Sequence, residues 1–308
     1  MRFPPTSRTA WAASSVCALA LAAPLVGCSA VGDDADDGAL EVLASFYPLQ
    51  FVAERVGGTD VTVSSLTPPA AEPHDLELSP SAVRSVGEAD LVVYLSGFQP
   101  ATDDAVAAQS PEHLVDVAAA AGLTGADGAA PSEPASDALD PHFWLDPTRL
   151  AAVAHEVADE LGTIDPENAA DYTERADALD AELTALDTRY TESLADCEGA
   201  TLVTSHAAFG YLAERYGLVQ VGISGIDPEA EPSPARLRQV REVVVADDVS
   251  TLFFEVLVSP KVTQTLADDL GVRTDVLDPL ESHSAERGDY LEVMESNLVA
   301  LESGLTCR

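Results

Sequence analysis

The chain has 308 residues, 46% of them hydrophobic, and a formal net charge of −38, from 15 Lys and Arg against 53 Asp and Glu. Nucleic-acid binding depends on clustered positive charge, so this composition argues against nucleic acid as a partner. We attribute most of the acidic charge to solvated surface, which can still raise the local concentration of cations.

Residues 1–27 have the features of an export signal. Arg2 and Arg8 give it a positively charged start, and the apolar, Ala-rich run that follows is too short for a comfortable membrane span. The junction Leu-Val-Gly-Cys at residues 25–28 resembles the lipobox of bacterial lipoproteins. We therefore expect lipid on Cys28, followed by a flexible acidic tether over residues 28–39. The alternative is an ordinary secretory signal with an incidental Cys.

Short β-rich runs alternate with helix-like stretches in both halves of the chain. The runs are residues 41–46, 61–66, 91–95 and 114–117, and then 201–204, 218–223, 251–256 and 273–277. Such alternation predicts mostly parallel sheets with flanking helices. The sequence therefore predicts an α/β fold of two similar lobes, each with a four-stranded sheet, over residues 40–165 and 197–308; a mature chain of this length can bury two modest cores.

The strongest helix pattern lies between the lobes, at residues 166–196. Asp165-Pro166-Glu167 predicts an N-cap followed by Pro at the first helical position. Apolar residues then recur in steps of four and three, at Tyr172, Ala176, Leu179, Leu183, Leu186, Tyr190 and Leu194. We expect one helix of roughly 40 Å that joins the lobes and resists hinge motion.

Two further segments bear on the organisation of the chain. Residues 124–139 are rich in Gly, Ala, Ser, Pro and Asp, which predicts a disordered surface loop. Cys197 and Cys307 are the only cysteines beyond the signal and Cys28. An even pair in an exported chain predicts a disulfide between them.

Three histidines and one aspartate lie where ligands are expected in such a fold. His142 is bracketed by two Asp-Pro dipeptides, which hold its segment rigid, and the second is expected to start a helix at Pro147. His74 and His206 follow predicted strands, and Asp278 stands at the end of the last strand. Because ligands bind beyond the carboxyl ends of the strands in open parallel sheets, we expect these four side chains to converge.

Three imidazoles and a carboxylate form a full tetrahedral set for Zn²⁺, and such nitrogen ligands suit zinc, copper or nickel better than magnesium or calcium. Copper more often binds thiol or thioether ligands, and manganese prefers more oxygen than this set provides. Whether the fourth ligand is Asp278 or water stays open at this point. Glu72 and Glu255 are candidates for carboxylates that support the ligands from outside or lie on the surface. The remaining histidines are weaker candidates, and they are His113, His155 and His283.

The chain resembles the zinc-binding lipoproteins of bacterial metal ABC importers, which are substrate-binding proteins with two lobes joined by a rigid helix. The resemblance covers residues 40–307, and its marks are residues 78–81, 140–147, 206–211, 229–234, 253–255 and 278–280. It implies that the metal ligands are His74, His142, His206 and Asp278. Manganese-binding relatives usually have Glu in place of His206, so the resemblance favours zinc. Where zinc-binding relatives often carry a His-rich loop, residues 124–139 contain no His.

The resemblance also implies a function. We expect high-affinity Zn²⁺ capture by a monomer outside the cytoplasm, attached to the cytoplasmic membrane through its lipid only, and delivery to an ABC permease. The alternatives are a carrier of Mn²⁺ or another divalent metal, a zinc metallohydrolase and a metal-stabilised adhesin. A hydrolase needs an open metal position and a general base, and the sequence offers no hydrolytic signature, so we expect no enzyme. Metal affinity is expected to fall below about pH 6 as imidazoles protonate.

Overall fold

The computed structural model describes residues 38–123, 139–257, 259–283 and 287–307. The export signal, Cys28, most of the tether and residues 124–138 of the predicted loop lie outside these residues. What the sequence predicts for those segments therefore remains a prediction. Both sheets belong to one structural unit that begins at Gly38.

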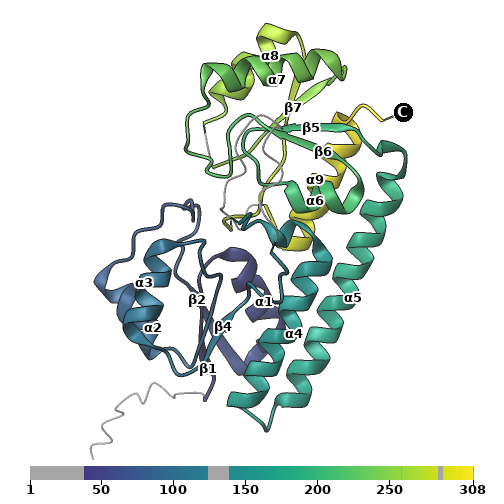
Figure 1. Cartoon of the computed structure of the whole chain (residues 1–308). Helices are drawn as coiled ribbons and strands as arrows, with labels where there is room; N and C mark the ends of the chain where they lie inside the picture. Colours follow the sequence, from purple (N-terminus) through teal and green to yellow (C-terminus); the bar gives the residue numbers. More distant parts are fainter. Residues whose placement is uncertain (1–37, 124–138, 258, 284–286, 308) are drawn as a thin grey trace, which may run out of the picture. The chain divides into compact units, whose positions relative to one another are not determined.

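The N-terminal lobe contains a sheet of four parallel strands in the order β2-β1-β3-β4 (Figure 1). Its elements are β1 Leu40–Ala44, α1 Tyr47–Gly57, β2 Val61–Ser65, α2 Pro80–Glu88, β3 Leu91–Tyr94, α3 Pro100–Gln109 and β4 Leu114–Asp116. Alternate residues of β1 serve opposite faces: Val42 and Ala44 pack into the main core, whereas Leu43 packs with Val86 of α2 and Val106 of α3. Burial of both faces explains why β3 reads as an unbroken apolar run.

The C-terminal lobe repeats this arrangement, with parallel strands in the order β6-β5-β7-β8. Its elements are β5 Thr201–Thr204, α6 Gly210–Tyr216, β6 Val219–Gly222, α7 Pro234–Ala246, β7 Thr251–Phe254, α8 Lys261–Leu270, β8 Arg273–Val276 and α9 Tyr290–Gly304. Val203 and Leu252 pack with Val240 of α7 and Leu266 of α8 on one face. The predicted fold class, two four-stranded parallel sheets with flanking helices, is confirmed.

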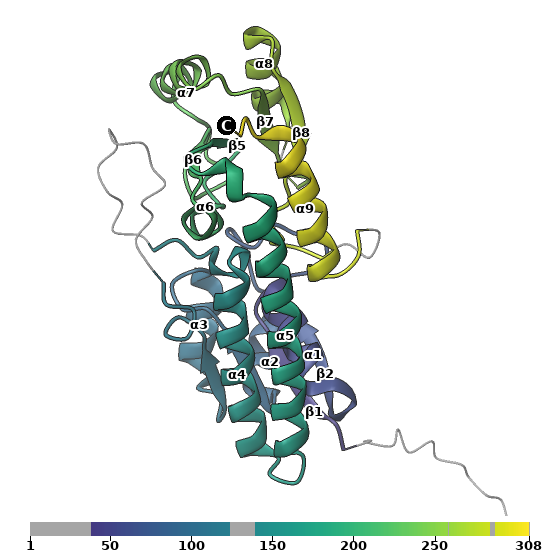
Figure 2. The same ribbon diagram turned by 90° about the vertical axis from the view of Figure 1, so that its right-hand side faces the viewer.

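Two long helices run side by side, and one of them, α5, continues from the N-terminal lobe to the C-terminal lobe (Figure 2). The two helices are α4 Pro147–Ile164 and α5 Ala169–Ser193. Every member of the predicted apolar stripe from Tyr172 to Leu194 is at most 2% exposed, which confirms the 3.6-residue periodicity. The Asp146 side chain caps α4 by accepting the backbone N–H of Thr148 at 2.9 Å, as expected from the Asp-Pro pair.

The start of α5 differs from the prediction. Asn168, without a side-chain cap, precedes the helix, and Asp165 ends α4 instead. The Asp165 carboxylate accepts hydrogen bonds from Asn168 Nδ2 at 2.6 Å and from the Tyr172 hydroxyl at 3.0 Å. The predicted N-cap was wrong because Asp165 is occupied in the turn between the two helices.

Specific contacts fix α5 to both lobes. Arg175 donates to the carbonyl of Gly57, at the end of α1, at 2.6 Å. The hydroxyl of Tyr190 donates to the carbonyl of Met294, in α9, at 2.6 Å. The predicted disulfide between Cys197 and Cys307 is present, and it ties the segment after α9 to the end of the linking region. These contacts attach α5 to elements of both lobes.

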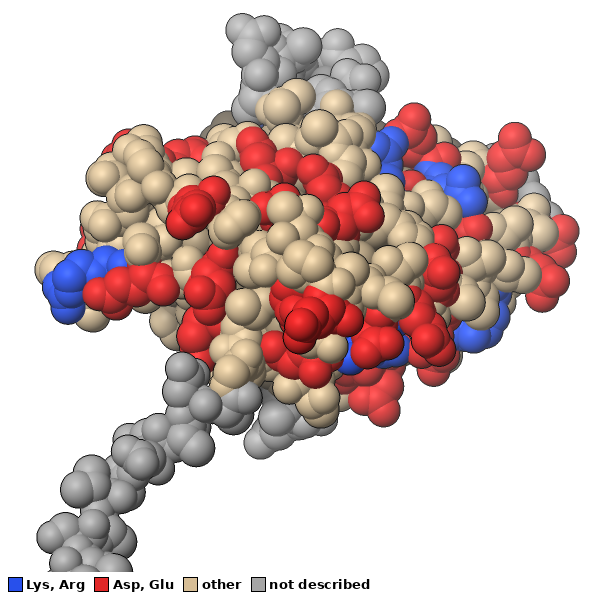
Figure 3. Space-filling model, turned by 90° about the horizontal axis from the view of Figure 1, so that it is seen from below, with Lys and Arg blue, Asp and Glu red and all other residues tan. Residues whose placement is uncertain are grey.

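Among the described residues, no helix combines the length and the apolarity needed to cross a bilayer. Figure 3 shows one face of the molecule, on which acidic side chains are spread among uncharged ones and basic side chains are few. On this face the acidic excess is therefore surface charge in contact with solvent.

Candidate metal centre

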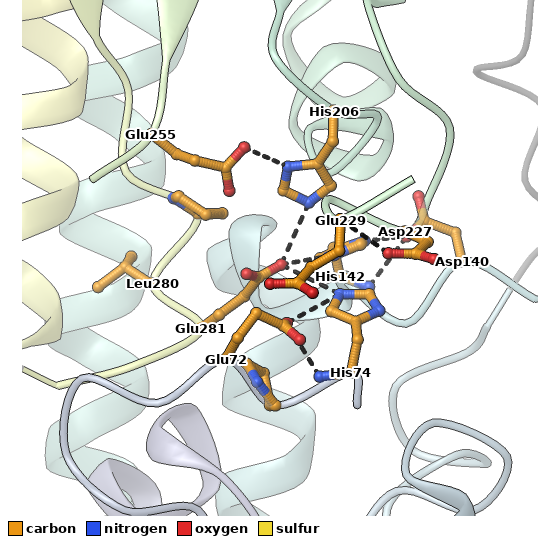
Figure 4. Close-up of polar contacts among 12 residues, drawn as sticks. Glu72, His74, Asp140, His142, His206, Asp227, Glu229, Glu255, Leu280 and Glu281 are labelled. Carbon is orange, nitrogen blue, oxygen red and sulfur yellow. Dashed lines mark hydrogen bonds and ion pairs between the residues drawn. The ribbon is translucent and has the colours of Figure 1, made fainter. Parts of the chain in front are cut away.

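Four side chains from separate segments meet between the two sheets (Figure 4). His74 follows β2, His142 precedes the short 3-10 turn Phe143–Leu145, His206 follows β5 and Glu281 follows β8. Their candidate ligand atoms all lie within 4.8 Å of one another. Glu281 Oε1 is the common point, at 3.3, 2.9 and 3.2 Å from the Nε2 atoms of His74, His142 and His206.

Asp278 does not join the imidazoles, contrary to the expectation from the sequence. One of its oxygens accepts the backbone N–H of Leu280 at 2.9 Å, and the other pairs with Arg287. The buried Asn297 side chain holds the backbone of Asp278, accepting its N–H at 2.9 Å and donating to its carbonyl at 2.7 Å. The carboxylate among the histidines is instead that of Glu281, three positions later.

A left-handed residue accounts for this difference. Leu280 has φ +59° and is 1% exposed, and it turns the chain so that Glu281 reaches the imidazoles. Trp144 Nε1 holds the same segment by donating to the carbonyl of Pro279 at 2.7 Å. Proximity to a strand end identified the correct segment but could not select between its two carboxylates, because the turn depends on these tertiary contacts.

The cluster lies mostly out of solvent. His142, His206 and Glu281 are at most 1% exposed, whereas the side chain of His74 is 11% exposed. Glu281 Oε2 is buried and has no hydrogen-bond partner among the described residues. An isolated carboxylate is costly in such a place. The three imidazoles are therefore what keeps Glu281 charged.

Electrostatic attraction between carboxylates and imidazoles shifts the pKa values of this cluster. Burial alone would raise the pKa of Glu281, but His206, His142 and His74 hold that pKa well below its usual range. Burial alone would lower the pKa of His206, but Glu281 and Glu255 outweigh it and raise the pKa to about 10. The pKa of His142 is also raised, because Asp140 and Glu281 outweigh its burial. Without a metal ion the cluster thus retains protons.

Two carboxylates orient the buried imidazoles. His206 Nδ1 donates to Glu255 Oε1 at 2.7 Å, and His142 Nδ1 donates to Asp140 Oδ1 at 2.7 Å. In both rings the Nε2 atom is thereby turned toward Glu281. Glu255 was one of the two supporting carboxylates considered from the sequence. Asp140 was missed in this role, although an Asp two residues before a His in a Pro-fixed segment is a usable signal.

Glu72 has a different contact. Its carboxylate accepts the backbone N–H groups of His74 at 2.9 Å and of Asp75 at 3.2 Å. It lies 4.0 Å from His74 Nε2, and burial raises its pKa. Glu72 therefore fixes the loop that presents His74 rather than the ring itself.

The other three histidines stand apart from the cluster. His113 Nδ1 contacts Glu160 at 2.7 Å and His155 Nε2 contacts Asp180 at 3.1 Å. The ring of His283 stacks on Tyr47, with centroids 4.7 Å apart. None of them belongs to the group of candidate ligands in the described part of the chain.

Aromatic side chains enclose the cluster on the N-terminal side. The ring of Trp144 lies 5.2 Å from that of His142, and the ring of Phe98 lies 4.8 Å from that of His74. Such apolar walls strengthen the electrostatic interactions inside them. Three imidazole nitrogens and one carboxylate oxygen in this setting are donors that suit tetrahedral Zn²⁺.

Several known proteins are similar to this chain in sequence and in fold. Zinc-binding lipoprotein AdcA of Streptococcus pneumoniae serotype 4 is 35% identical over 305 residues, which cover 94% of this chain and 59% of AdcA. The chain thus spans less than two thirds of that relative. The high-affinity zinc uptake system protein ZnuA of Bacillus subtilis is 32% identical over 285 residues, which cover 88% of this chain and 89% of ZnuA.

A solved structure matches as well. The crystal structure of the Zn(II)-bound ZnuA-like domain of Streptococcus pneumoniae AdcA superposes with a TM-score of 0.73 at 33% identity, covering 87% of this chain and 99% of that one. The sequence model of the family described as "Zinc-uptake complex component A periplasmic" matches residues 42–304, which include all four clustered side chains. The chain therefore belongs to the ZnuA family of zinc-uptake components.

Proposed function

We propose that this protein captures Zn²⁺ outside the cytoplasm and delivers it to an ABC-type permease. The observation that carries the proposal is the contact of Glu281 Oε1 with three imidazoles from both lobes, at 2.9 to 3.3 Å. In this proposal His74, His142, His206 and Glu281 each give one atom to the ion. The names of the relatives, a zinc-binding lipoprotein and a zinc uptake protein, support the same metal.

The chemistry of the donors favours carriage over catalysis. With four protein ligands in place, no position is left for the water that a zinc hydrolase activates. Glu255 and Asp140 accept the Nδ1 protons of His206 and His142, which leaves both Nε2 atoms free to bind metal once their protons depart. The donor set therefore suits reversible binding of an ion, and we propose no enzyme activity.

Access to the ion is expected past His74, because its side chain is the most exposed of the four. The surface acids visible in Figure 3 favour the approach of cations to the protein. We expect release to depend on docking to the permease, since α5 is anchored to both lobes by Arg175 and Tyr190.

The location of the protein is part of the proposal. The relative AdcA is described as a lipoprotein, and Cys28 of this chain ends a lipobox-like sequence. We propose that residues 1–27 are removed, that Cys28 carries lipid and that residues 28–39 tether a monomer to the outer face of the cytoplasmic membrane. The division into lobes at 40–165 and 197–308 with a linker at 166–196 belongs to the same proposal.

Calorimetric titration of the protein without its signal tests the function. We expect one tight Zn²⁺ site per chain and a loss of affinity of more than about 100-fold in His206→Ala and in His142→Ala, because losing a ligand costs more than losing an outer partner. His155→Ala is the matched control, since His155 contacts Asp180 away from the cluster. It should bind like the parent.

Two results would contradict the proposal. Hydrolysis of ester or peptide probes by the zinc-loaded parent would favour an enzyme. Preferential binding of Mn²⁺ in competition with Zn²⁺ would overturn the choice of metal while leaving the fold intact.

A further inference from the structure

The carboxylate of Asp140 lies against a glycine of the other lobe. Asp140 belongs to the N-terminal half of the molecule, and Gly210 is the first residue of α6 in the C-terminal half. A Cβ atom at position 210 would lie 2.7 Å from Asp140 Oδ2. Real Cβ atoms essentially never come within 3.0 Å of another heavy atom, so any side chain here would have to displace the carboxylate.

The backbone does not explain the glycine. Gly210 is not among the residues with positive φ, so alanine could adopt its conformation. The close approach of Asp140 is therefore the feature that needs glycine at this position.

The carboxylate has little freedom to retreat. Its Oδ1 atom accepts the backbone N–H of His142 at 3.0 Å and the ring Nδ1–H of His142 at 2.7 Å. The hydroxyl of Tyr211, from α6, donates to the Asp140 carbonyl at 2.9 Å. Gln220 of β6 borders the same space, with its Oε1 3.8 Å from the position of the added Cβ. Because the two oxygens belong to one planar carboxylate, displacing Oδ2 would also displace Oδ1. The hydrogen bonds of Oδ1 would then shift the ring of His142.

We propose that Gly210 is a positioning residue of the metal site. By lacking a side chain, it lets α6 of one lobe hold the Asp140 carboxylate of the other lobe against His142, and it thereby fixes the orientation and tautomer of that ligand. The inference rests on the proposed function, because its effect is a change in zinc affinity. It adds a residue that is not one of the four candidate ligands.

Zinc titration of Gly210→Ala in the protein without its signal tests the inference. We expect affinity to fall about 10- to 100-fold, the usual effect of losing a partner that orients a metal-binding His. Gly225→Ala is the control: Gly225 does not have positive φ and a Cβ there meets nothing within 4 Å. It should bind like the parent, and the visible absorption of bound Co²⁺ should change only in Gly210→Ala.

A double-mutant cycle separates this role from a general loss of structure. Asp140→Ala removes the carboxylate and with it the collision, so adding Gly210→Ala to it should change zinc affinity less than about 2-fold. If Gly210→Ala lowers the melting temperature, the double variant should recover it relative to that single variant. An additive loss of affinity in the double variant would overturn the inference.

The outcomes also distinguish this inference from the proposed function. A parent protein that does not bind Zn²⁺ means that the proposed function fails. A parent that binds tightly alongside a Gly210→Ala variant of equal affinity means that the function stands and the inference fails.

Discussion

Glu281 Oε1 accepts a hydrogen bond from His142 Nε2 at 2.9 Å, although 139 positions separate the two residues and they come from opposite lobes. The same Nε2 atom is the one that His142 would offer to a metal ion. The hydrogen bond therefore occupies the place of a coordination bond, and a proton must leave before the ion can bind. Zinc affinity and its dependence on pH should therefore both reflect the ionisation of this cluster.

Glu281→Gln and Asp278→Asn test which carboxylate completes the site. Glu281→Gln should lower zinc affinity more than about 100-fold, because it removes a direct ligand charge among three imidazoles. Asp278→Asn should bind nearly like the parent, since its side-chain oxygen can still accept the N–H of Leu280. Calorimetry of both variants measures this. The reverse order of effects would restore Asp278 as the ligand.

Local patterns predicted the fold well. The strand runs and the apolar stripe of α5 depend on spacing along a few turns of chain, so their position can be read without knowledge of distant contacts. The start of α5 was wrong because Asp165-Pro166 is also a good end for the preceding helix. Two local signals competed there, and only the packing of both helices decides between them.

His74 and His206 were predicted from their positions after strands, and His142 from its two Asp-Pro brackets, but the carboxylate of the site was not predicted. A leucine rarely adopts φ +59°, so the turn at Leu280 has no signature in its own sequence. Asn297 and Trp144, which hold that turn, are distant in the chain. The choice of Glu281 over Asp278 is thus a tertiary property that sequence spacing cannot show.

Glu255→Gln should lower zinc affinity about 10- to 100-fold without changing the 1:1 stoichiometry, because Glu255 orients the ring of His206 through a 2.7 Å contact. Glu160→Gln is the matched control, since Glu160 makes a 2.7 Å contact with His113 away from the cluster. Calorimetric titration of both variants checks the prediction. Equal affinities would mean that the carboxylate does not support the ligand.

Zinc binding should release protons at neutral pH. The pKa of His206 is about 10 in the metal-free protein, above the reference of about 6.5, so its proton stabilises the fold fully below pH 6.5 and is lost as pH rises through 10. Zinc must displace this proton, and His142, whose pKa is raised in the same way, adds to the release. Zinc affinity should therefore continue to rise with pH above 7, rather than level off above pH 6.

Titration in two buffers of different ionisation enthalpy counts the released protons. We expect about one to two protons per zinc ion at pH 7 for the parent, and fewer for His206→Ala. The melting temperature of the metal-free parent should fall between pH 7 and pH 10, whereas that of His206→Ala should fall less. Zinc binding without proton release at pH 7 would contradict the ionisation state deduced for the cluster.

Substitutions of Leu280 by glycine and by alanine should give an unusual order of unfolding free energies. Leu280→Ala removes a buried side chain and should cost about 2–5 kcal/mol of unfolding free energy. Leu280→Gly removes the same contacts and one methyl group more, yet we expect it to be about 1 kcal/mol more stable than Leu280→Ala, because glycine adopts φ +59° without strain. Urea unfolding of the metal-free variants measures the difference. If the alanine variant were the more stable, as is usual away from left-handed positions, then the turn that brings Glu281 to the imidazoles would not be left-handed in solution.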